Sequence, residues 1–152
     1  MASIKRTDSS DKDFHKLVER LDKDLLERYN ELQLFYRQFN KIENISTVLV
    51  AYEEGLPVGC GCFKPFDEES VEVKRMYVSD EHRGKGIGAA ILSELEKWAA
   101  ELNYKYIVLE TGNKQPEAIT LYKKSGYLII PNYGQYARKE DTSICMRKGI
   151  SG

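Results

Sequence analysis

Cysteine, proline and long apolar runs are scarce in this chain of 152 residues, which contains 3 Cys and 4 Pro. The cysteine count is odd, and Cys60-Gly61-Cys62 lacks the two-residue gap of a zinc or redox pair, so we expect neither a disulfide framework nor a metal site. No apolar run approaches the roughly 20 residues of a membrane span, and residues 1–13 are polar where a signal peptide would be apolar. We therefore expect a cytoplasmic protein with no membrane partner.

An excess of charge of one sign is also lacking, because 23 Lys and Arg residues stand against 24 Asp and Glu residues. The resulting net charge of -1 provides no overall field that would attract nucleic acid or an anionic membrane, so we expect neither as a partner. The chain is 41% hydrophobic and contains no linker, repeat or low-complexity segment, which favours a single domain over residues 1–152. Composition leaves the oligomeric state open, a homodimer included.

The most informative stretch is residues 76–92, MYVSDEHRGKGIGAAIL, in which a short apolar strand leads through a glycine-rich loop into an amphipathic helix. Glycines at the start of a helix let the backbone approach a ligand closely, and the first helical N–H groups have no partner inside the helix. Together with the positive end of the helix dipole, these groups form an anion site, most naturally for phosphate.

Two kinds of phosphate-binding loop fit this stretch poorly. A nucleoside triphosphate loop needs Gly-Lys-Ser/Thr, whereas Lys85 is followed by Gly86. A dinucleotide fingerprint fits Gly84, Gly86 and Ala89, with Glu110 at the distance of a ribose-binding acid. However, a polar segment separates the strand from Gly84, where a dinucleotide-binding turn would be tight, so an NAD site is the weaker interpretation.

The spacing Arg83-x-x-Gly86-x-Gly88 resembles the pyrophosphate-binding motif of the GNAT superfamily, the acetyl-CoA-dependent N-acetyltransferases. The resemblance implies acetyl-CoA as cosubstrate, whereas a glycine-rich turn without a ligand is the plain alternative. Gln115 stands where many members have an Asn, so the resemblance leaves open whether Gln115 or Asn113 contacts CoA. The residues implied to bind CoA are Met76, Tyr77, Val78, Arg83, Gly84, Lys85, Gly86, Ile87, Gly88, Asn113, Gln115 and Tyr122.

Hydrophobic periodicity predicts the order β-α-α-β-β-β-α-β-α-β-β, which resembles the GNAT fold. The expected fold class is α/β (α+β) with a mixed sheet. The strands of this sheet are expected to be antiparallel except for a splayed parallel pair around the CoA site. A capping box at Ser10 and Asp13 predicts the start of the first helix, and the polar residues 22–24 predict the break that divides it in two. The apolar phase changes within residues 71–78, which predicts a bulge near residues 74–75.

Acetyl transfer to an amine needs a proton acceptor for the ammonium group and a proton donor for the departing thiolate. The resemblance implies Tyr122 as the donor, although an aromatic residue on an apolar helix stripe is more often part of the core. Glu72 lies eleven residues before Arg83, which is the offset of the general-base Glu in the family members that have such a base. Its place between Val71 and Val73 equally suits a solvated residue on a strand in which polar and apolar residues alternate. Glu110 is the second candidate for the base.

The acceptor is the least defined element of the prediction. Family members bind it between the first helices and the last hairpin loop, which implies Tyr29, Tyr133 and Tyr136 as substrate-binding residues. We expect direct attack by the primary amine of a small acceptor in a ternary complex. The acceptor is expected to be cationic, because nearby carboxylates can attract it, namely Asp22, Asp24 and Glu31. A protein or peptide N-acetyltransferase and an acyl-CoA-binding regulator without turnover are the alternatives.

Overall fold

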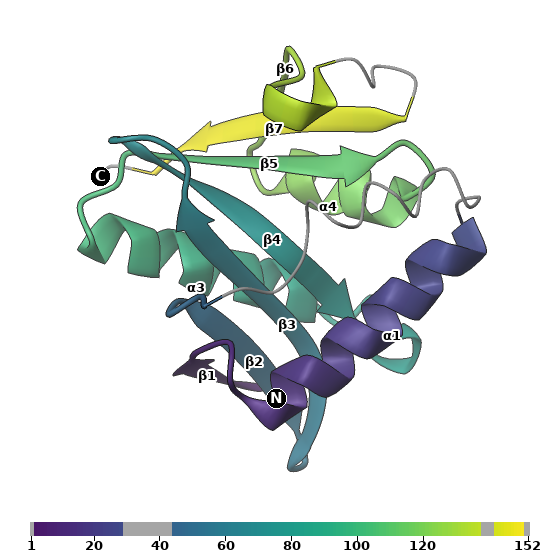
Figure 1. The fold of residues 1–152 in the computed structure, drawn as a ribbon. Coiled ribbons are helices and arrows are strands. Elements are labelled where there is room, and N and C mark those ends of the chain that lie inside the picture. The colour runs from purple at the N-terminus through teal and green to yellow at the C-terminus, as the bar shows by residue number, and fades with distance from the viewer. Residues whose placement is uncertain (1, 29–43, 138–141, 151–152) are drawn as a thin grey trace. The chain divides into compact units, whose positions relative to one another are not determined.

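The computed structural model describes residues 2–28, 44–137 and 142–150. Within these ranges, helices and strands follow the predicted order (Figure 1), and the second predicted helix lies outside them. The described residues also form two short 3-10 turns, η2 (Asp80–His82) and η3 (Gly134–Tyr136). The regular elements are β1 (Ser3–Thr7), α1 (Lys12–Arg28), β2 (Val48–Glu53), β3 (Leu56–Pro65), β4 (Ser70–Val78), α3 (Ile87–Glu101), β5 (Tyr106–Gly112), α4 (Pro116–Lys124), β6 (Leu128–Ile130) and β7 (Ser143–Gly149).

Seven strands of the described residues form one sheet in the order β1-β2-β3-β4-β5-β7-β6. Strand β4 pairs in parallel with β5 over Ser70–Val73 and Tyr106–Leu109, whereas the pairs β1–β2, β2–β3, β5–β7 and β6–β7 are antiparallel. This mixed sheet confirms the predicted fold class. A parallel pair requires a long crossover, and α3 provides it.

Contacts between residues group the chain into two compact units. Unit 1 consists of Met1–Lys64 and Lys74–Leu95, and unit 2 consists of Pro65–Val73 and Glu96–Gly152. A single domain over residues 1–152 stays a prediction. No helix among the described residues is both long enough and apolar enough to span a membrane.

In unit 1, helix α1 is capped by Asp11. Its carboxylate accepts hydrogen bonds from the backbone N–H groups of Asp13 at 2.9 Å and Phe14 at 3.1 Å. The predicted capping box at Ser10 is therefore wrong. The Ser10 N–H group and hydroxyl both bind the carboxylate of Asp8, which forms its own turn before the helix.

The predicted break at residues 22–24 is also wrong, because α1 continues through them to Arg28. Without a Gly or Pro, those polar residues simply occupy the outer part of the helix. The buried face of α1 packs on β2 and β3. The core residues of this contact are Phe14, Leu17, Val18, Val48, Val50, Cys60 and Cys62.

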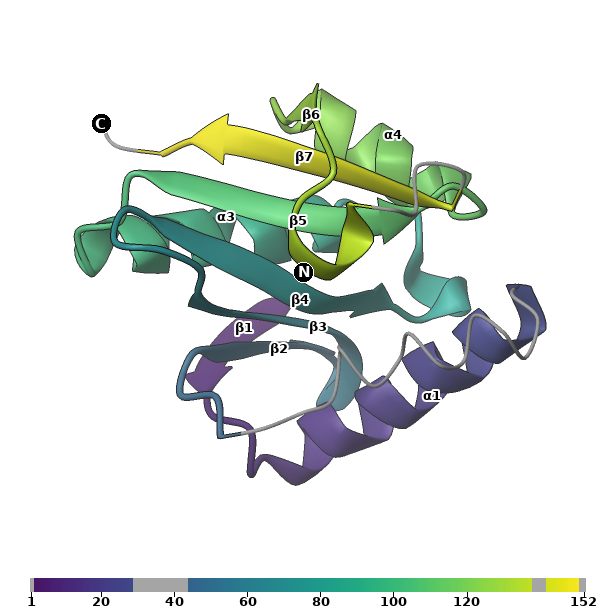
Figure 2. The ribbon, with the colours of Figure 1, turned by 45° about the horizontal axis from the view of Figure 1, so that its top comes forward.

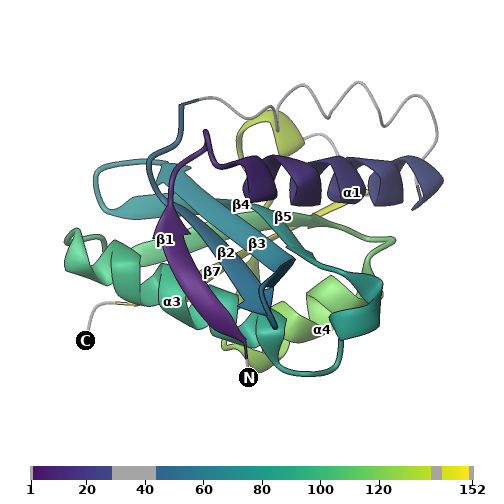
Figure 3. The same ribbon diagram turned by 90° about the horizontal axis from the view of Figure 1, so that it is seen from below.

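The other face of β3 carries two glycines beneath α3, so α1 and α3 cover opposite faces of β2 and β3 (Figure 3). A Cβ atom placed on Gly61 would lie 2.6 Å from Met76 Sδ, and one placed on Gly59 would lie 2.9 Å from Ile91 Cδ1. No side chain fits into such a space without displacing its neighbours. The two glycines therefore allow α3 to pack closely on the strand.

Strand β4 is irregular where the sequence predicts a bulge. Arg75 has a φ of +57°, in the left-handed region that non-glycine residues rarely adopt. The neighbouring carbonyls face β3, since Cys62 Sγ donates to Lys74 O and Cys60 Sγ donates to Arg75 O, both at 3.3 Å. The pairing of β4 with β5 ends at Val73, just before this irregularity.

In unit 2, β5 and β7 run antiparallel over seven residue pairs, with β6 on the outer side of β7 and α4 along one face (Figure 2). Pairing aligns Glu72, Val108 and Arg147 across β4, β5 and β7, so these side chains share one face of the sheet. Lys148 belongs to the opposite face and forms an ion pair with Glu96 at 2.8 Å.

Candidate functional site

The glycine-rich loop of unit 1 has the backbone geometry that the sequence predicts for an anion site. Gly84 and Gly86 have φ values of +80° and +83°, and a Cβ atom on either would meet nothing within 4 Å. Helix α3 starts at Ile87, and the first hydrogen bond at this end runs from Ala90 N–H to Gly86 O at 3.0 Å. The N–H groups just before Ala90 therefore lack a partner within the helix, and no acidic residue lies in the first turn.

Arg83 connects this loop to the end of β4. Its Nε donates to Val78 O at 2.8 Å, and its Nη1 forms an ion pair with Asp80 at 2.7 Å. The guanidinium also lies 5.7 Å from the centre of the Tyr77 ring. The contacts of Arg83 thus order the backbone before the glycines, in addition to placing a positive charge beside them.

A second group of charges at the loop involves Glu53, which sequence reasoning missed. Glu53 Oε2 lies 3.7 Å from Lys85 Nζ and 3.5 Å from His82 Nε2, and the other ring nitrogen of His82 lies 2.8 Å from Ser79 Oγ. Glu53 Oε2 is buried without a hydrogen bond within the described part of the chain. Glu53 ends β2, far from the loop in sequence, and no local pattern signals the contact.

The predicted pantetheine-binding residues Met76, Tyr77 and Val78 close β4 and are partly exposed. They belong to unit 1, together with Ile87 and Gly88 at the start of α3. These placements are compatible with the predicted CoA contacts. The contacts themselves stay predictions.

In unit 2, Tyr122 lies on α4 and is buried. Burial raises the pKa of Tyr122, and so does the negative charge of the Glu110 carboxylate. The ring meets that of Tyr127 edge to face at 5.9 Å, and within the described residues the hydroxyl has no hydrogen-bond partner. Tyr122 is thus both a core residue and a phenol that stays protonated at neutral pH.

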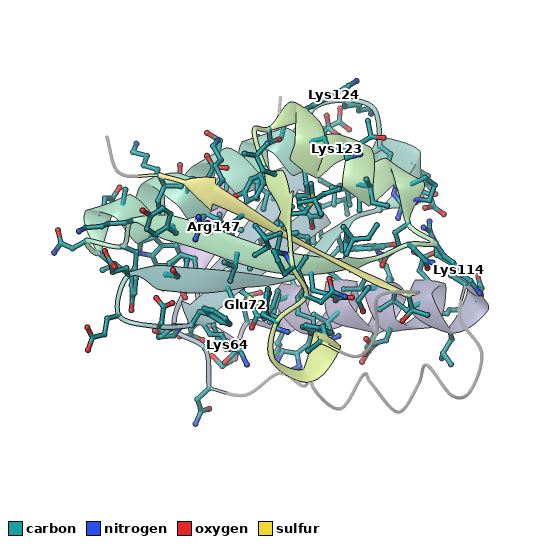
Figure 4. The ribbon with its side chains drawn as sticks, turned by 90° about the horizontal axis from the view of Figure 1, so that it is seen from above. Lys64, Glu72, Lys114, Lys123, Lys124 and Arg147 are labelled. Atoms are coloured by element: carbon teal, nitrogen blue, oxygen red, sulfur yellow. The ribbon has the colours of Figure 1, made fainter. Side chains whose placement is uncertain are left out.

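Glu72 is only 4% exposed, so it is not a solvated strand residue. Its side chain is labelled in Figure 4. Its Oε2 accepts a hydrogen bond from the Tyr133 hydroxyl at 2.8 Å. Burial and the charge of Glu72 raise the pKa of Tyr133 well above its ordinary value. The Tyr133 ring contacts Phe66 at 4.8 Å and Tyr136 at 5.7 Å, so the structure brings three predicted site residues together and adds Phe66.

The two alternatives for the amide contact to CoA lie at the start of α4. Gln115 Oε1 accepts a hydrogen bond from Gly112 N–H at 3.1 Å, and the Asn113 N–H group donates to Thr142 O at 2.9 Å. Part of the Gln115 side chain therefore serves the turn between β5 and α4. No group of three or more His, Cys, Asp or Glu residues within the described ranges could hold a metal ion.

The acidic residues expected to attract a cationic acceptor are partly engaged elsewhere. Asp22 forms an ion pair with Arg75 at 2.7 Å, and Asp24 with Arg28 at 3.4 Å. These arginines offset the negative charge that the prediction assigned to the acceptor. Tyr29 and Glu31 lie outside the described residues.

Comparison with known proteins identifies the family. The model of the acetyltransferase (GNAT) family matches residues 14–127. The chain is 32% identical over 143 residues to an IAA acetyltransferase of Azospirillum brasilense, with 89% of each chain covered. A candidate acyl-CoA N-acyltransferase from Klebsiella pneumoniae has 27% identity and a TM-score of 0.82, with 99% of this chain and 98% of that chain covered.

A more distant structure shares the fold. The phosphinothricin acetyltransferase of Sinorhizobium meliloti, solved in complex with AcCoA, has 21% identity and a TM-score of 0.70, with 99% of this chain and 89% of that chain covered. The match over residues 14–127, the relative with 32% identity and the mixed sheet agree. The chain therefore belongs to the GNAT family of acetyltransferases.

Proposed function

We propose that the protein transfers the acetyl group of acetyl-CoA to the primary amine of a small, cationic acceptor by direct attack in a ternary complex. The observation that carries the proposal is the loop from Gly84 to Gly88. Two of its glycines adopt left-handed conformations with open space beside them, directly before a helix start that has no acidic residue. This arrangement favours an anion such as the CoA pyrophosphate.

The residues present fit CoA. A pyrophosphate needs bare backbone N–H groups and room to approach them, and Gly84 and Gly86 offer both. Lys85 adds a half-exposed positive charge. The AcCoA complex of the related fold supports the same cosubstrate, whose thioester supplies an activated acetyl group.

Glu72 is the proposed proton acceptor. An alkylammonium group must lose a proton before its nitrogen can attack, and a buried carboxylate that the Tyr133 hydroxyl holds in place is suited to accept it. The negative charge of this carboxylate favours a cationic acceptor, since it attracts ammonium groups. Glu110 remains the second candidate.

Tyr122 is the proposed proton donor. Its burial and the nearby charge of Glu110 keep the phenol protonated at neutral pH, as a general acid requires. In the proposed reaction the ammonium gives one proton to Glu72, the carbon–nitrogen bond forms as the carbon–sulfur bond breaks, and Tyr122 protonates the departing sulfur. The second proton of the amine, lost as the amide forms, returns to the phenolate of Tyr122, and Glu72 releases its proton to solvent. Backbone N–H groups near Tyr77 and Val78 are proposed to stabilise the charge on the carbonyl oxygen.

Release of free thiol from acetyl-CoA in the presence of an amine panel tests this proposal. We expect turnover with small primary amines that carry an additional positive charge, and slower turnover with neutral or anionic amines. Activity on peptides alone would indicate a protein-modifying enzyme. Binding of acetyl-CoA without thiol release for any amine or peptide would indicate an acyl-CoA-binding regulator.

A further inference from the structure

Tyr133 and Glu72 form a pair whose geometry is fixed from several sides. The phenol hydroxyl donates to Glu72 Oε2 at 2.8 Å, and the carboxylate is almost fully buried. The rings of Phe66 and Tyr136 meet the Tyr133 ring edge to face, at interplanar angles of 66° and 83°. A ring held on two sides has little freedom to turn, so its hydroxyl holds one oxygen of the carboxylate in place.

The backbone around this pair is restrained as well. Asn132 Nδ2 donates to Tyr136 O at 3.1 Å and to Ser143 O at 3.0 Å, which closes the loop that carries Tyr133. On the other side, Phe66 N–H donates to Ser70 O at 2.9 Å in the turn immediately before the strand of Glu72. Each partner of the hydrogen bond therefore comes from a backbone segment that is held in place.

The electrostatics of the pair favour a phenol that donates and a carboxylate that accepts. Within the described part of the chain, the groups whose charge raises the pKa of Tyr133 are Glu72 on β4, Cys145 on β7 and Tyr136 on η3. Burial, followed by the charge of Glu72, raises the pKa of Tyr133, so the phenol keeps its proton at every pH at which an assay is practical. A hydrogen bond donated to a carboxylate stabilises its ionised form.

We propose that Tyr133 is a positioning residue that aims the carboxylate of Glu72, and that it is not primarily a contact for the acceptor. This inference rests on the proposed function, in which Glu72 accepts the ammonium proton. The family resemblance implied that Tyr133 contacts the acceptor, because of the loop in which it lies. The structure instead directs its hydroxyl to the carboxylate, and the ring packing explains why an aromatic residue carries that hydroxyl.

The first test is the pH profile of a Tyr133→Phe variant. Phenylalanine keeps the ring and its packing but removes the hydroxyl that holds the carboxylate of Glu72. We expect kcat to fall roughly tenfold with little change in the KM of the acceptor, and the acid limb of kcat/KM to move to higher pH, because a hydrogen bond donated to a carboxylate favours its charged form. The dissociation constant for acetyl-CoA should not change. An unmoved acid limb, or a defect confined to the KM of the acceptor, overturns the proposal.

Tyr127→Phe is the matched control, because the buried Tyr127 also donates a hydrogen bond to a glutamate, Glu96, at 3.1 Å. It should leave the acid limb in place. Phe66→Leu provides an independent variant, should Tyr133→Phe fold poorly. It loosens the Tyr133 ring and should shift the limb in the same direction by a smaller amount, whereas no shift overturns the proposal.

A second measurement needs no turnover. Carbon NMR of the glutamate carboxyl groups, with the Glu72 signal assigned through Glu72→Gln, reports the surroundings of this carboxyl group directly. In Tyr133→Phe this signal should shift at neutral pH, because the carboxyl group loses its phenol donor, and an unchanged signal overturns the proposal. If no amine is acetylated by the wild-type protein, the proposed function fails while this signal still decides whether Tyr133 holds Glu72. Full activity of Glu72→Gln would overturn the role of Glu72 as base, and with it the role of Tyr133.

Discussion

The carboxylate of Glu53 lies 3.7 Å from the ammonium group of Lys85, so a negative charge at the end of β2 is directed toward the loop that we propose for the CoA phosphates. A bound phosphate and Glu53 would compete for the same cation. The carboxylate oxygen in this contact is buried and has no hydrogen bond among the described residues, which makes its charge more effective than that of an exposed Glu.

We predict that Glu53→Gln tightens acetyl-CoA binding by about two- to fivefold at low ionic strength, because it removes the competing negative charge. The gain should shrink in high salt, as screening reduces interactions between partly exposed charges. Isothermal titration calorimetry at two salt concentrations measures both effects. Glu54→Gln, which changes the adjacent residue of the same turn, is the control. Weaker binding by Glu53→Gln would mean that Glu53 orders the loop.

The glycine loop offers a test with an internal control. Gly86 and Gly55 have almost the same φ, +83° and +81°, and a Cβ atom on either would meet nothing within 4 Å. Valine at either position should therefore cause a similar backbone strain, on the order of 1–2 kcal/mol. Gly55 lies in the turn between β2 and β3, so only Gly86→Val should also lose acetyl-CoA binding.

Thermal unfolding with and without acetyl-CoA distinguishes these two glycine variants. At about 100 times its dissociation constant, acetyl-CoA should stabilise the wild-type protein and Gly55→Val by about 2.7 kcal/mol, a melting shift of several degrees. Gly86→Val should show no such shift. An equal shift in both variants would exclude the loop from the CoA site, and a larger wild-type shift with NAD would favour the dinucleotide interpretation.

Tyr122→Phe should retain the fold and acetyl-CoA binding but lose turnover by about 100-fold, because it deletes the proposed acid while keeping the ring. The hydroxyl makes no hydrogen bond among the described residues, so little stability should be lost with it. Raising the pH does not supply a missing acid, so the defect should persist in alkaline buffer. Steady-state kinetics between about pH 6 and 9 measure this, and unchanged kcat would leave Tyr122 as a core residue alone.

Periodicity in the sequence predicted the order of strands and helices and the irregularity at Arg75, because these depend on neighbouring residues. It misplaced the helix cap by one residue, since Ser10 and Asp11 can both cap and only Asp11 does. Contacts between distant residues were not predictable. The Tyr133–Glu72 bond joins residues 61 positions apart, and no local pattern encodes it.

We predict that the buried cysteine Cys62 makes the protein less stable at high pH. Burial raises the pKa of the Cys62 thiol to about 12, so the native state keeps a proton that the unfolded chain releases near pH 8.5. The free energy of unfolding should therefore fall as pH rises from about 9 towards 12, by at most about 1.4 kcal/mol per pH unit for this group. Urea titrations across this range measure the slope, which Cys62→Ala should reduce. An unchanged slope in Cys62→Ala would assign the loss to other groups.

The absence of a side chain at Gly59 affects more than the packing of β3. A Cβ atom there would lie 3.3 Å from Cγ2 of Ile87, the first residue of α3, and 3.1 Å from the carbonyl oxygen of Tyr77. Both neighbours flank the glycine-rich loop, since Tyr77 lies in β4 before it and Ile87 begins α3 after it. The absence of a side chain at Gly59 therefore lets the start of α3 lie close to β3. The affinity that we propose for this loop can therefore depend on a residue that never touches the anion. Two chains with identical loops can differ in that affinity when one of them has a larger residue at this position.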